Sequence, residues 1–514
     1  MATRFLVGVM LVGAVAVWPC AALAQPYPTR PARNRNQRPV PQPEPPATGA
    51  LALSLGGPGA DYGKDVAIDR RGNILLTGYF TQSADLDPTE GQHIVTSAGS
   101  SDIFLLKLSP AGVLQWIVTL GGAGADMPSA LTTDADGNIL LTGYYSGIVN
   151  FAPGEAHDGR RAVGQRDAFI AKYTPRGTLA WTVTFGSPGE DEGLAIAVDE
   201  LGHVVASGVV SGPVALNPEQ PQLMFAGGGG EDAFIAAYSP EGRFEWGSVF
   251  GGPGPDQADA VAFASRNEIY VSGVFSGNVD FDAGRGSFPV RSAGKRDAFV
   301  ARFAGPRPVW VTPFGGRGDD YAAPGGLCVR PDGTVLFTGR FPGRVRFGDV
   351  QLSSAGEDDG FVAEVRRDGT PLNAISFGGA GEDGGYRVRL DARGQCIVTG
   401  AFAGTANFAS APERALLSAR AANGVTDAFV AKYDTRLRLQ WAAGYGGALA
   451  DRGPGRIPDG GVAAGLALDA DDRILVTGRY YERAVLYGSG AGLERKSAGV
   501  ADCFLLRLSP QGTP

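Results

Sequence analysis

Short apolar runs, separated by tight polar turns, recur along the chain. In the first group they cover 64–69, 74–80, 103–108 and 113–120, and the tight turns between them read RRGN and SPAG. Runs of this length, bounded by glycine turns and alternating in polarity as at 103–108, predict β-strands. No window shows an apolar period of 3.6 residues, so we predict an all-β protein with four strands in each group.

The four-strand group returns with a fixed period. Its markers are Gly-Gly-x-Gly-x-Asp before the first strand, Thr-Gly or Ser-Gly in the second and Asp-x-Phe in the third. The first marker, degenerate in two copies, ends at Asp61, Asp126, Asp191, Asp256, Asp320, Asp383 and Asp451, with spacings of 63 to 68 residues. The second has its glycine at 78, 143, 208, 273, 339, 400 and 478, and the third begins at 102, 167, 232, 297, 359, 427 and 502. The repeats, numbered 1 to 7 below, start near 55, 120, 185, 250, 314, 377 and 445, and so long a period indicates a propeller or a solenoid.

Four short strands in each repeat favour a β-propeller over a helical solenoid. Seven repeats predict seven four-stranded blades. Repeat 7 ends after its third strand, near Gly512, while Gly49–Leu55 precedes repeat 1 and aligns with the fourth-strand run 113–120. We therefore expect this N-terminal strand to complete the last blade and close the ring, because closure removes an exposed sheet edge.

The repeat unit, typified by GGAGAD…DADGNILLTGYYSG…NFAPG…RDAFIAKYTPRGTLAWTVTFG, resembles the SBBP-type bacterial β-propeller repeat. The resemblance covers about residues 49 to 514. It implies a secreted or cell-surface propeller but no single activity, because a propeller is a scaffold that hosts unrelated functions. Repeat 7 departs most from the pattern, with Leu449 in place of a loop glycine and an insertion over 452–461.

The first 47 residues differ from the repeats in composition. Arg4, the apolar run 5–17 and Ala22-Leu23-Ala24 follow the order of a signal peptide, so we predict one over 1–24. Residues 25–47 hold eight prolines and four arginines and predict an extended, disordered linker. No later segment reaches about 18 consecutive apolar residues, the length that a membrane helix needs. We expect a soluble propeller, 48–514, exported to the periplasm, the cell surface or the medium.

Charge and composition narrow the functions. With 53 acidic against 45 basic residues, the formal charge is −8, which leaves no basic face for a phosphate backbone, so we expect no nucleic-acid partner. The three histidines, at positions 93, 157 and 203, share no motif and leave little for imidazole catalysis. Cysteines 328, 396 and 503 each lie in a predicted strand of a different repeat, and we expect buried free thiols.

The aspartates that end the Gly-Gly-x-Gly-x-Asp loops are the candidate site. Each stands just before an innermost strand, so all seven are expected around one mouth of the central channel. If the carboxylates turn inward, Asp61, Asp126, Asp191, Asp256, Asp320, Asp383 and Asp451 form a ring that binds a hard divalent cation such as Ca²⁺. If they turn back, each caps its own loop, and the sevenfold repetition favours this alternative. We predict no other cofactor.

Tryptophans recur at one position of the fourth strand, where they predict packing between blades. They stand at 116, 181, 246, 310 and 441, while Leu51 and Asn373 occupy the remaining two copies. The loops between second and third strands, such as 82–101, 147–166 and 212–231, vary while the flanking strands repeat. Variable loops on a rigid scaffold are where binding specificity lies, so we expect these loops to carry it.

We expect a non-catalytic binding or interaction scaffold outside the cell. Its ligand would be an extracellular protein or a carbohydrate, and we expect a monomer without a transmembrane segment. The alternative is a carboxylate-based extracellular hydrolase or lyase, for example one directed at polysaccharides, with its site at the channel mouth. Two carboxylates ~5–10 Å apart in an open funnel favour hydrolysis, and a filled channel contradicts it.

Overall fold

The apolar runs of the sequence form antiparallel strands that pair in sets of four. A computed structural model describes residues 51–513 apart from 90, 155–157, 266, 283–285, 411–412, 420–425, 446–462, 482 and 486–493. These residues belong to one compact unit, Pro46–Pro514, and contain strands but no helix. The all-β prediction is confirmed for this part of the chain. The predicted signal peptide and linker lie outside it.

The strands follow the repeats in order. Repeats 1 and 2 form β2 (Tyr62–Ile68), β3 (Ile74–Phe80), β6 (Asp102–Leu108), β7 (Leu114–Leu120), β8 (Met127–Thr133), β9 (Ile139–Tyr145), β12 (Asp167–Tyr173) and β13 (Leu179–Phe185). Repeats 3 and 4 form β14 (Glu192–Val198), β15 (Val204–Val210), β16 (Asp232–Tyr238), β17 (Phe244–Phe250), β18 (Gln257–Ser265), β19 (Glu268–Asp280), β20 (Pro289–Ala304) and β21 (Arg307–Gly316). Repeats 5 to 7 form β22 (Tyr321–Val329), β23 (Val335–Phe347), β24 (Val350–Val365), β25 (Pro371–Gly379), β26 (Gly384–Leu390), β27 (Cys396–Ala403), β30 (Thr426–Tyr433), β31 (Leu439–Tyr445), β32 (Ala463–Leu468), β33 (Ile474–Tyr480) and β36 (Asp502–Leu508), and β1 (Leu51–Leu55) precedes them all.

Each set of four strands is an antiparallel sheet in which the chain runs from the innermost strand outward. The orders are β2-β3-β6-β7, β8-β9-β12-β13, β14-β15-β16-β17 and β26-β27-β30-β31. The sets of repeats 4 and 5 are joined into one larger sheet, because β21 also pairs with β23. The last sheet, β32-β33-β36-β1, takes its outermost strand from the other end of the described chain.

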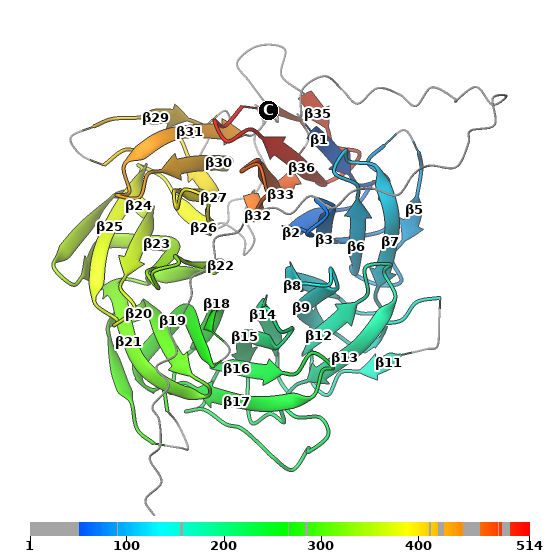
Figure 1. Ribbon diagram of the computed structural model, residues 1–514, viewed down its shortest axis with the longest axis horizontal. Coiled ribbons are helices and arrows are strands. Elements are labelled where there is room, and N and C mark those ends of the chain that lie inside the picture. Colours follow the sequence, from blue (N-terminus) through cyan, green and yellow to red (C-terminus); the bar gives the residue numbers. More distant parts are fainter. Residues whose placement is uncertain are drawn as a thin grey trace, which may run out of the picture. The chain divides into compact units, whose positions relative to one another are not determined.

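The sheets stand around one axis, with their innermost strands at the centre (Figure 1). Each innermost strand contacts the next: β2 with β8, β8 with β14, β14 with β18, β18 with β22, β22 with β26 and β26 with β32. The strand β32 in turn contacts β2. The seven repeats therefore follow one another side by side, and the last lies against the first.

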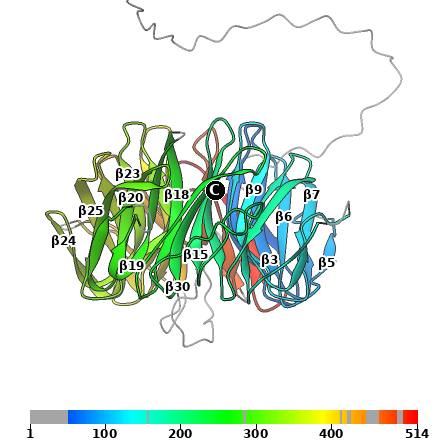
Figure 2. The same cartoon turned by 90° about the horizontal axis from the view of Figure 1, so that it is seen from below.

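The two ends of the sheets carry different connections (Figure 2). One end, called the turn face, carries the tight turns within each sheet, such as 69–73 and 109–113 in repeat 1. The other end, called the loop face, carries the loops between second and third strands and those between repeats, such as 81–101 and 121–126. A bridge between Gly56 and Asp85 places both kinds of loop together.

The loop-face connections contain small hairpins of their own. They are β4 (Ser83–Asp85) with β5 (Ile94–Thr96), β10 (Ile148–Asn150) with β11 (Gly159–Arg161), β28 (Thr405–Asn407) with β29 (Leu416–Ser418) and β34 (Arg483–Val485) with β35 (Glu494–Lys496). In repeats 4 and 5 the long strands β19, β20, β23 and β24 extend into the same position. These hairpin arms enlarge the loop face.

The hydrophobic core lies between sheets rather than within one. One cluster joins Leu75 and Leu105 of repeat 1 to Leu141 and Phe169 of repeat 2, all fully buried. Strand β3 is buried along its whole length, because neighbouring sheets cover both of its sides. Most of the favourable free energy of burial therefore comes from interfaces between repeats, as in other repeat proteins.

Strand β1 belongs to two interfaces at once. It pairs with β36 in register from Leu51 opposite Arg507 to Leu55 opposite Cys503. Leu55 packs in a cluster with repeat 1, and Ala52 packs in a cluster with repeat 6. The pairing of the N-terminal strand with the last repeat is the one that the sequence predicted.

At the turn face the recurring tryptophan contacts the next repeat in two ways, through a hydrogen bond and through packing on a glycine; we call this pair of contacts the clasp. Trp116 Nε1 donates a hydrogen bond of 3.1 Å to the carbonyl oxygen of Pro175, and Trp181, Trp310 and Trp441 do the same to the following turns. The indole ring lies on a turn glycine: a Cβ at Gly177 (φ +82°) would come within 3.1 Å of Trp116. Leu51 takes this place against Gly112. The prediction that these side chains pack between repeats is confirmed.

The clasp changes on both sides where the tryptophan is missing. Asn373 stands opposite Glu364, as Trp116 stands opposite Lys107. In the following turn the glycine is replaced by Leu437, which is buried and keeps a left-handed φ of +59°. Leucine rarely adopts this conformation. The side chain of Leu437 therefore fills space that the missing indole leaves.

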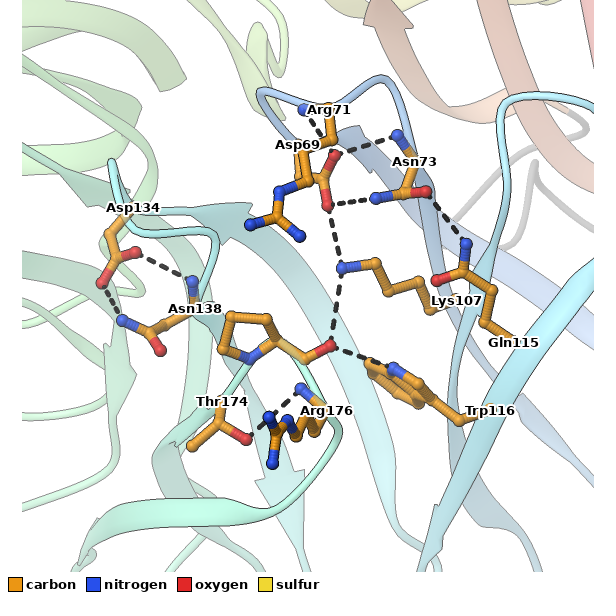
Figure 3. A network of polar contacts seen from close by, with 11 residues as sticks. Asp69, Arg71, Asn73, Lys107, Gln115, Trp116, Asp134, Asn138, Thr174 and Arg176 are labelled. Atoms are coloured by element: carbon orange, nitrogen blue, oxygen red, sulfur yellow. Dashed lines mark hydrogen bonds and ion pairs between the residues drawn. The ribbon is translucent and has the colours of Figure 1, made fainter. Parts of the chain in front are cut away.

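A buried ion pair lies beneath the clasp of repeat 1 (Figure 3) and recurs in several other repeats. Lys107 Nζ is 2.8 Å from Asp69 Oδ2, and Lys172 with Asp134 and Lys432 with Asp391 repeat the pair. Repeat 5 reverses it, with Arg330 at the acid position and Glu364 at the base position, 2.5 Å apart. Reversal keeps both charges paired, which matters because an unpaired buried charge is strongly destabilising.

Because Asn373 and Leu437 replace the tryptophan and the glycine of the clasp together, we expect a double-mutant cycle to show energetic coupling between the two positions. Asn373→Trp alone should cost about 1–3 kcal/mol by overpacking, and Leu437→Gly alone about 2–5 kcal/mol by leaving a cavity. Together they rebuild the Trp–Gly clasp, so urea unfolding should show a double variant at least about 1 kcal/mol more stable than the sum. Leu372→Trp, on the exposed neighbouring residue, is the control and should not couple with Leu437→Gly. Additive effects at 373 and 437 would contradict the pairing.

Candidate functional site

The six described loop aspartates are buried and bind their own loops. Each has an exposed fraction of 0 or 1%. One carboxylate oxygen accepts a bond of 2.5–2.8 Å from the N–H four residues earlier in Asp61, Asp126, Asp191, Asp256, Asp320 and Asp383. In all but Asp320 the other oxygen accepts a bond of 2.8–3.2 Å from the N–H three residues after the glycine of the second marker. Asp451 lies outside the described residues.

The same aspartates join each repeat to the one before. The N–H of Asp126 donates 3.0 Å to the carbonyl of Ser101, which precedes the third strand of repeat 1. Equivalent bonds leave the other five aspartates, and that of Asp61 reaches Ala501 of repeat 7 at 2.8 Å. One residue thus folds the loop through its side chain and ties two repeats through its backbone.

A second buried aspartate faces each of these loops. It is the aspartate of the Asp-x-Phe marker, and it lies against the first glycine of the motif. A Cβ at Gly251 would come 2.0 Å from Asp232 Oδ1 and 2.9 Å from Asp256 Oδ2. Glycine is therefore required at this position, because two carboxylates occupy the space of a side chain.

Burial and the facing carboxylate disturb the acidity of the loop aspartates. Burial raises the pKa of Asp61, Asp320 and Asp383 to about 7 and that of Asp126 and Asp256 to about 6. The backbone N–H bonds lower these values, and the facing aspartate raises them further. In Asp61 that neighbour is Asp502 of repeat 7. Near neutral pH the junctions therefore take up and release protons.

Asp320 lacks one of the two donors that the other loops supply. Its Oδ1 is buried without a hydrogen-bond partner. The position that carries Thr81 in repeat 1 and Ser276 in repeat 4 is Pro342 in repeat 5. Proline has no backbone N–H, which explains the orphaned oxygen.

The observed contacts are those of the capping alternative. In five of the six aspartates both carboxylate oxygens accept backbone N–H bonds, which a bound cation would have to displace. In the part of the chain that the structure describes, no group of three or more His, Cys, Asp or Glu side chains is placed to hold a metal ion. The calcium ring, including Asp451, stays a prediction.

The histidines and cysteines of the described residues add no further candidate site. His203 Nδ1 is 3.0 Å from Asp199 Oδ2 in a turn, where it takes the place of the usual asparagine. His157 lies outside the described residues. Cys328, Cys396 and Cys503 are free thiols in three different strands, and Cys396 and Cys503 are buried as predicted, whereas Cys328 is partly exposed. Burial raises the pKa of Cys503 to about 12. Its low reactivity follows from this, since the thiolate is the reactive form.

The central channel holds a cavity of 350 Å³ between the innermost strands. Apolar residues such as Ala130, Leu131 and Val261 line most of it, together with the charged Asp65, Arg387 and Arg389. Arg387 Nε is 3.8 Å from Asp65 Oδ1. Both residues stand where neighbouring repeats have alanine or glycine, a difference that an alignment of the repeats shows.

Exposed apolar side chains gather on the loop face. Among the large apolar residues that are more than 40% exposed, those of the loops between second and third strands are Ile94, Ile148, Val163, Leu223, Met224, Leu416 and Val500. Ile94 and Leu416 occupy corresponding places in two hairpin arms, with exposed fractions of 65 and 58%. The variable loops therefore present apolar groups to the solvent.

Residues 53–85 match the family model of the SBBP β-propeller repeat. An uncharacterized WD repeat-containing protein of Acanthamoeba polyphaga mimivirus is 30% identical over 185 residues, 31% of this chain and 13% of that protein. The regulatory protein FlaEY of Caulobacter vibrioides is 27% identical over 210 residues, 38% of this chain and 21% of that protein. The match thus spans about a fifth or less of the length of these curated relatives.

Two solved structures cover most of the chain at low identity. The WD40 domain of Neurospora crassa Pan2 has a TM-score of 0.41 and 9% identity, covering 89% of this chain and 92% of that one. A protein of unknown function from Dyadobacter fermentans has a TM-score of 0.38 and 11% identity, covering 89 and 99%. No helix of the described residues is long and apolar enough to cross a membrane.

The sheets of four antiparallel strands around one axis define a β-propeller repeat protein. Residues 53–85, in repeat 1, match the SBBP repeat whose motifs the sequence analysis quoted.

Because Asp320 has an oxygen without a hydrogen-bond partner, we expect that a variant supplying a donor to it is more stable, by an amount that depends on pH. The pKa of Asp320, about 7, lies above the value of ~3.9 in an unfolded chain, so the folded protein binds this proton more tightly. The resulting stabilisation is complete at pH 4 and is lost as the pH rises through 7. Pro342→Ser supplies the missing N–H and lowers that pKa. Urea unfolding should show a gain of about 1–2 kcal/mol at pH 8 and a smaller gain at pH 5, after the cost of losing proline.

The reverse change provides the control. Ala403 N donates 3.0 Å to Asp383 Oδ1, so Ala403→Pro removes the equivalent bond and should destabilise the protein, more at pH 8 than at pH 5. An unchanged stability of Pro342→Ser at both pH values would show that the orphaned oxygen has no energetic cost.

Proposed function

We propose that the protein is an exported, non-catalytic binding scaffold that contacts a protein partner outside the cell through its loop face. The observation that carries the proposal is the exposure of Ile94, Ile148 and Leu416 on separate hairpin arms of that face. Exposed apolar groups cost free energy in water, and a partner surface that covers them recovers it. Export rests on the predicted signal peptide, 1–24.

A rigid support for these arms follows from the junctions beneath them. Gly56 exchanges backbone bonds of 3.1 and 3.0 Å with Asp85, at the base of the first arm. Gly251 bridges Asp280 in the same way in repeat 4. A loop whose base is fixed loses less conformational entropy on binding, which favours affinity.

The alternative, a carboxylate-based hydrolase or lyase, finds less support. Its reaction needs two carboxylates that a polymer can reach. The facing pairs, such as Asp256 with Asp232, are 1 and 2% exposed. Pairs this deeply buried favour a structural role, so we prefer the scaffold.

We infer seven blades in a ring that β1 closes. The pairing of β1 with β36, the position of Leu51 against Gly112 and the bond of 2.6 Å from Arg507 Nη1 to the carbonyl of Pro110 all support closure. Each of them repeats at the last junction a contact that other junctions make.

Deletion of Leu51–Leu55 tests closure. It removes a strand's ladder and the apolar groups that β1 buries, so we expect a loss of several kcal/mol, at about 1 kcal/mol per hydrogen bond plus burial. Thermal unfolding of the mature chain measures it. Deletion of Gln25 to Pro45, in the predicted linker, is the control and should leave the melting temperature unchanged. An unchanged melting temperature after the first deletion would refute closure.

Site-specific photo-crosslinking tests the binding function. A crosslinking amino acid at 94, 148 or 416 should give the same discrete adduct in cells that export the protein, and Ile148→Ser should weaken the adduct from position 94. The controls are positions 113 and 201, which carry exposed Val113 and Leu201 on the turn face. Equal adducts from both faces, or adducts from the turn face alone, would contradict the proposal.

A further inference from the structure

A polar cavity of 730 Å³ lies on the turn face between repeats 1 and 2. Its walls are the turn after β2, the start of β7 and the turn between β12 and β13. The lining side chains that matter here are Arg71, Asn73, Lys107, Gln115, Thr174 and Arg176 (Figure 3). All of them are charged or carry amide or hydroxyl groups, so the cavity suits a hydrophilic ligand.

Hydrogen bonds hold the inner wall in place. Asp69 Oδ1 accepts from the backbone N–H groups of Arg71 and Asn73 at 2.9 Å, and its Oδ2 accepts from Asn73 Nδ2 at 2.8 Å. Gln115 Nε2 donates 3.0 Å to Asn73 Oδ1. The clasp from Trp116 to Pro175 fixes the opposite wall. The site is therefore preorganised, which lowers the entropic cost of binding.

The cavity carries two positive charges, those of Arg71 and Arg176, that no acidic side chain of the described residues pairs with. Lys107 is neutralised by Asp69 at 2.8 Å. Arg71 and Arg176 are exposed, and neither guanidinium has an ion pair or hydrogen bond among the described residues. Two free guanidinium groups on one cavity attract an anion, for which arginine offers paired donors.

The other junctions do not repeat this charge. At the junction of repeats 2 and 3 the same two positions are Asp136 and Glu241, and at that of repeats 5 and 6 they are Asp332 and Arg436. Because these positions are exposed turn residues, the scaffold does not dictate them. Two arginines together are therefore a property of the first junction and not of the fold.

We propose that this cavity binds an acidic oligosaccharide, one that carries the carboxylates of uronic acid residues. The carboxylate pairs with Arg71 and Arg176, while sugar hydroxyls meet the amide of Gln115 and the hydroxyl of Thr174. Sugars present such groups on every side, which matches a cavity lined by polar side chains. No aromatic ring lines the described cavity, and a nucleotide base would need one to stack on.

Titration calorimetry with a galacturonic acid oligomer tests the proposal. We expect binding that weakens with salt, that falls about tenfold or more in Arg71→Gln and in Arg176→Gln, and that is lost in the double variant. Arg393→Gln together with Arg436→Gln, at equivalent turn positions of repeat 6, is the matched control and should bind like the wild type. Melting temperatures should agree across the set, because all four side chains are exposed.

Three outcomes would overturn it. A neutral galactose oligomer that binds as tightly would show that the arginines do not select the ligand. Inorganic sulfate that binds as tightly would show a simple anion site. Binding that survives in the double variant would place the site elsewhere. Each of these leaves the crosslinking test of the loop face untouched, because that test uses the opposite face.

Discussion

The aspartate that precedes each described innermost strand is the residue on which the junctions between repeats depend. Its carboxylate folds the preceding loop and its N–H binds the repeat before, as Asp126 does with Gly122 and Ser101. Burying a carboxylate without such donors would cost several kcal/mol, so side chain and loop require each other. Where one donor is missing, at Pro342, the acid is left partly unsatisfied. The first glycine of the motif is fixed by the same constraint, because two carboxylates fill the space around it.

Packing and charge balance in this protein are set at the junctions between repeats rather than within single repeats. A change in one repeat is accompanied by a compensating change in the next. Where Asn373 replaces the tryptophan, Leu437 replaces the glycine that faces a tryptophan elsewhere. The buried ion pair shows the same compensation within one repeat, where Arg330 and Glu364 exchange the positions of acid and base. Such changes are physically linked because packing density and charge balance are set where two surfaces meet. An isolated repeat would expose both of its apolar sides, which explains why neighbours adapt together.

The sequence alone predicted the strands, their fourfold grouping and the pairing of β1 with the last repeat, because these follow from periodic patterns. It predicted which aspartates matter but left their role open. A motif shows that a residue recurs, whereas the direction of its side chain depends on the donors around it, such as the N–H of Ser146. The charged residues that break the pattern, Arg387 and Arg71 among them, were missed. A search for what repeats passes over positions that differ, and single functions lie at such positions.

The two faces therefore have different freedom to vary. At the loop face the first arm is joined to a junction by the backbone bonds between Asp85 and Gly56, so change is confined to exposed side chains such as Ile94 and Leu416. At the turn face the buried ion pairs and the clasps end one residue below the surface. The next residue outward, Arg71 in one repeat and Asp136 in another, touches nothing that the fold needs. A scaffold of this kind can acquire a charged site at one junction without loss of stability, because only the outermost side chains have to change.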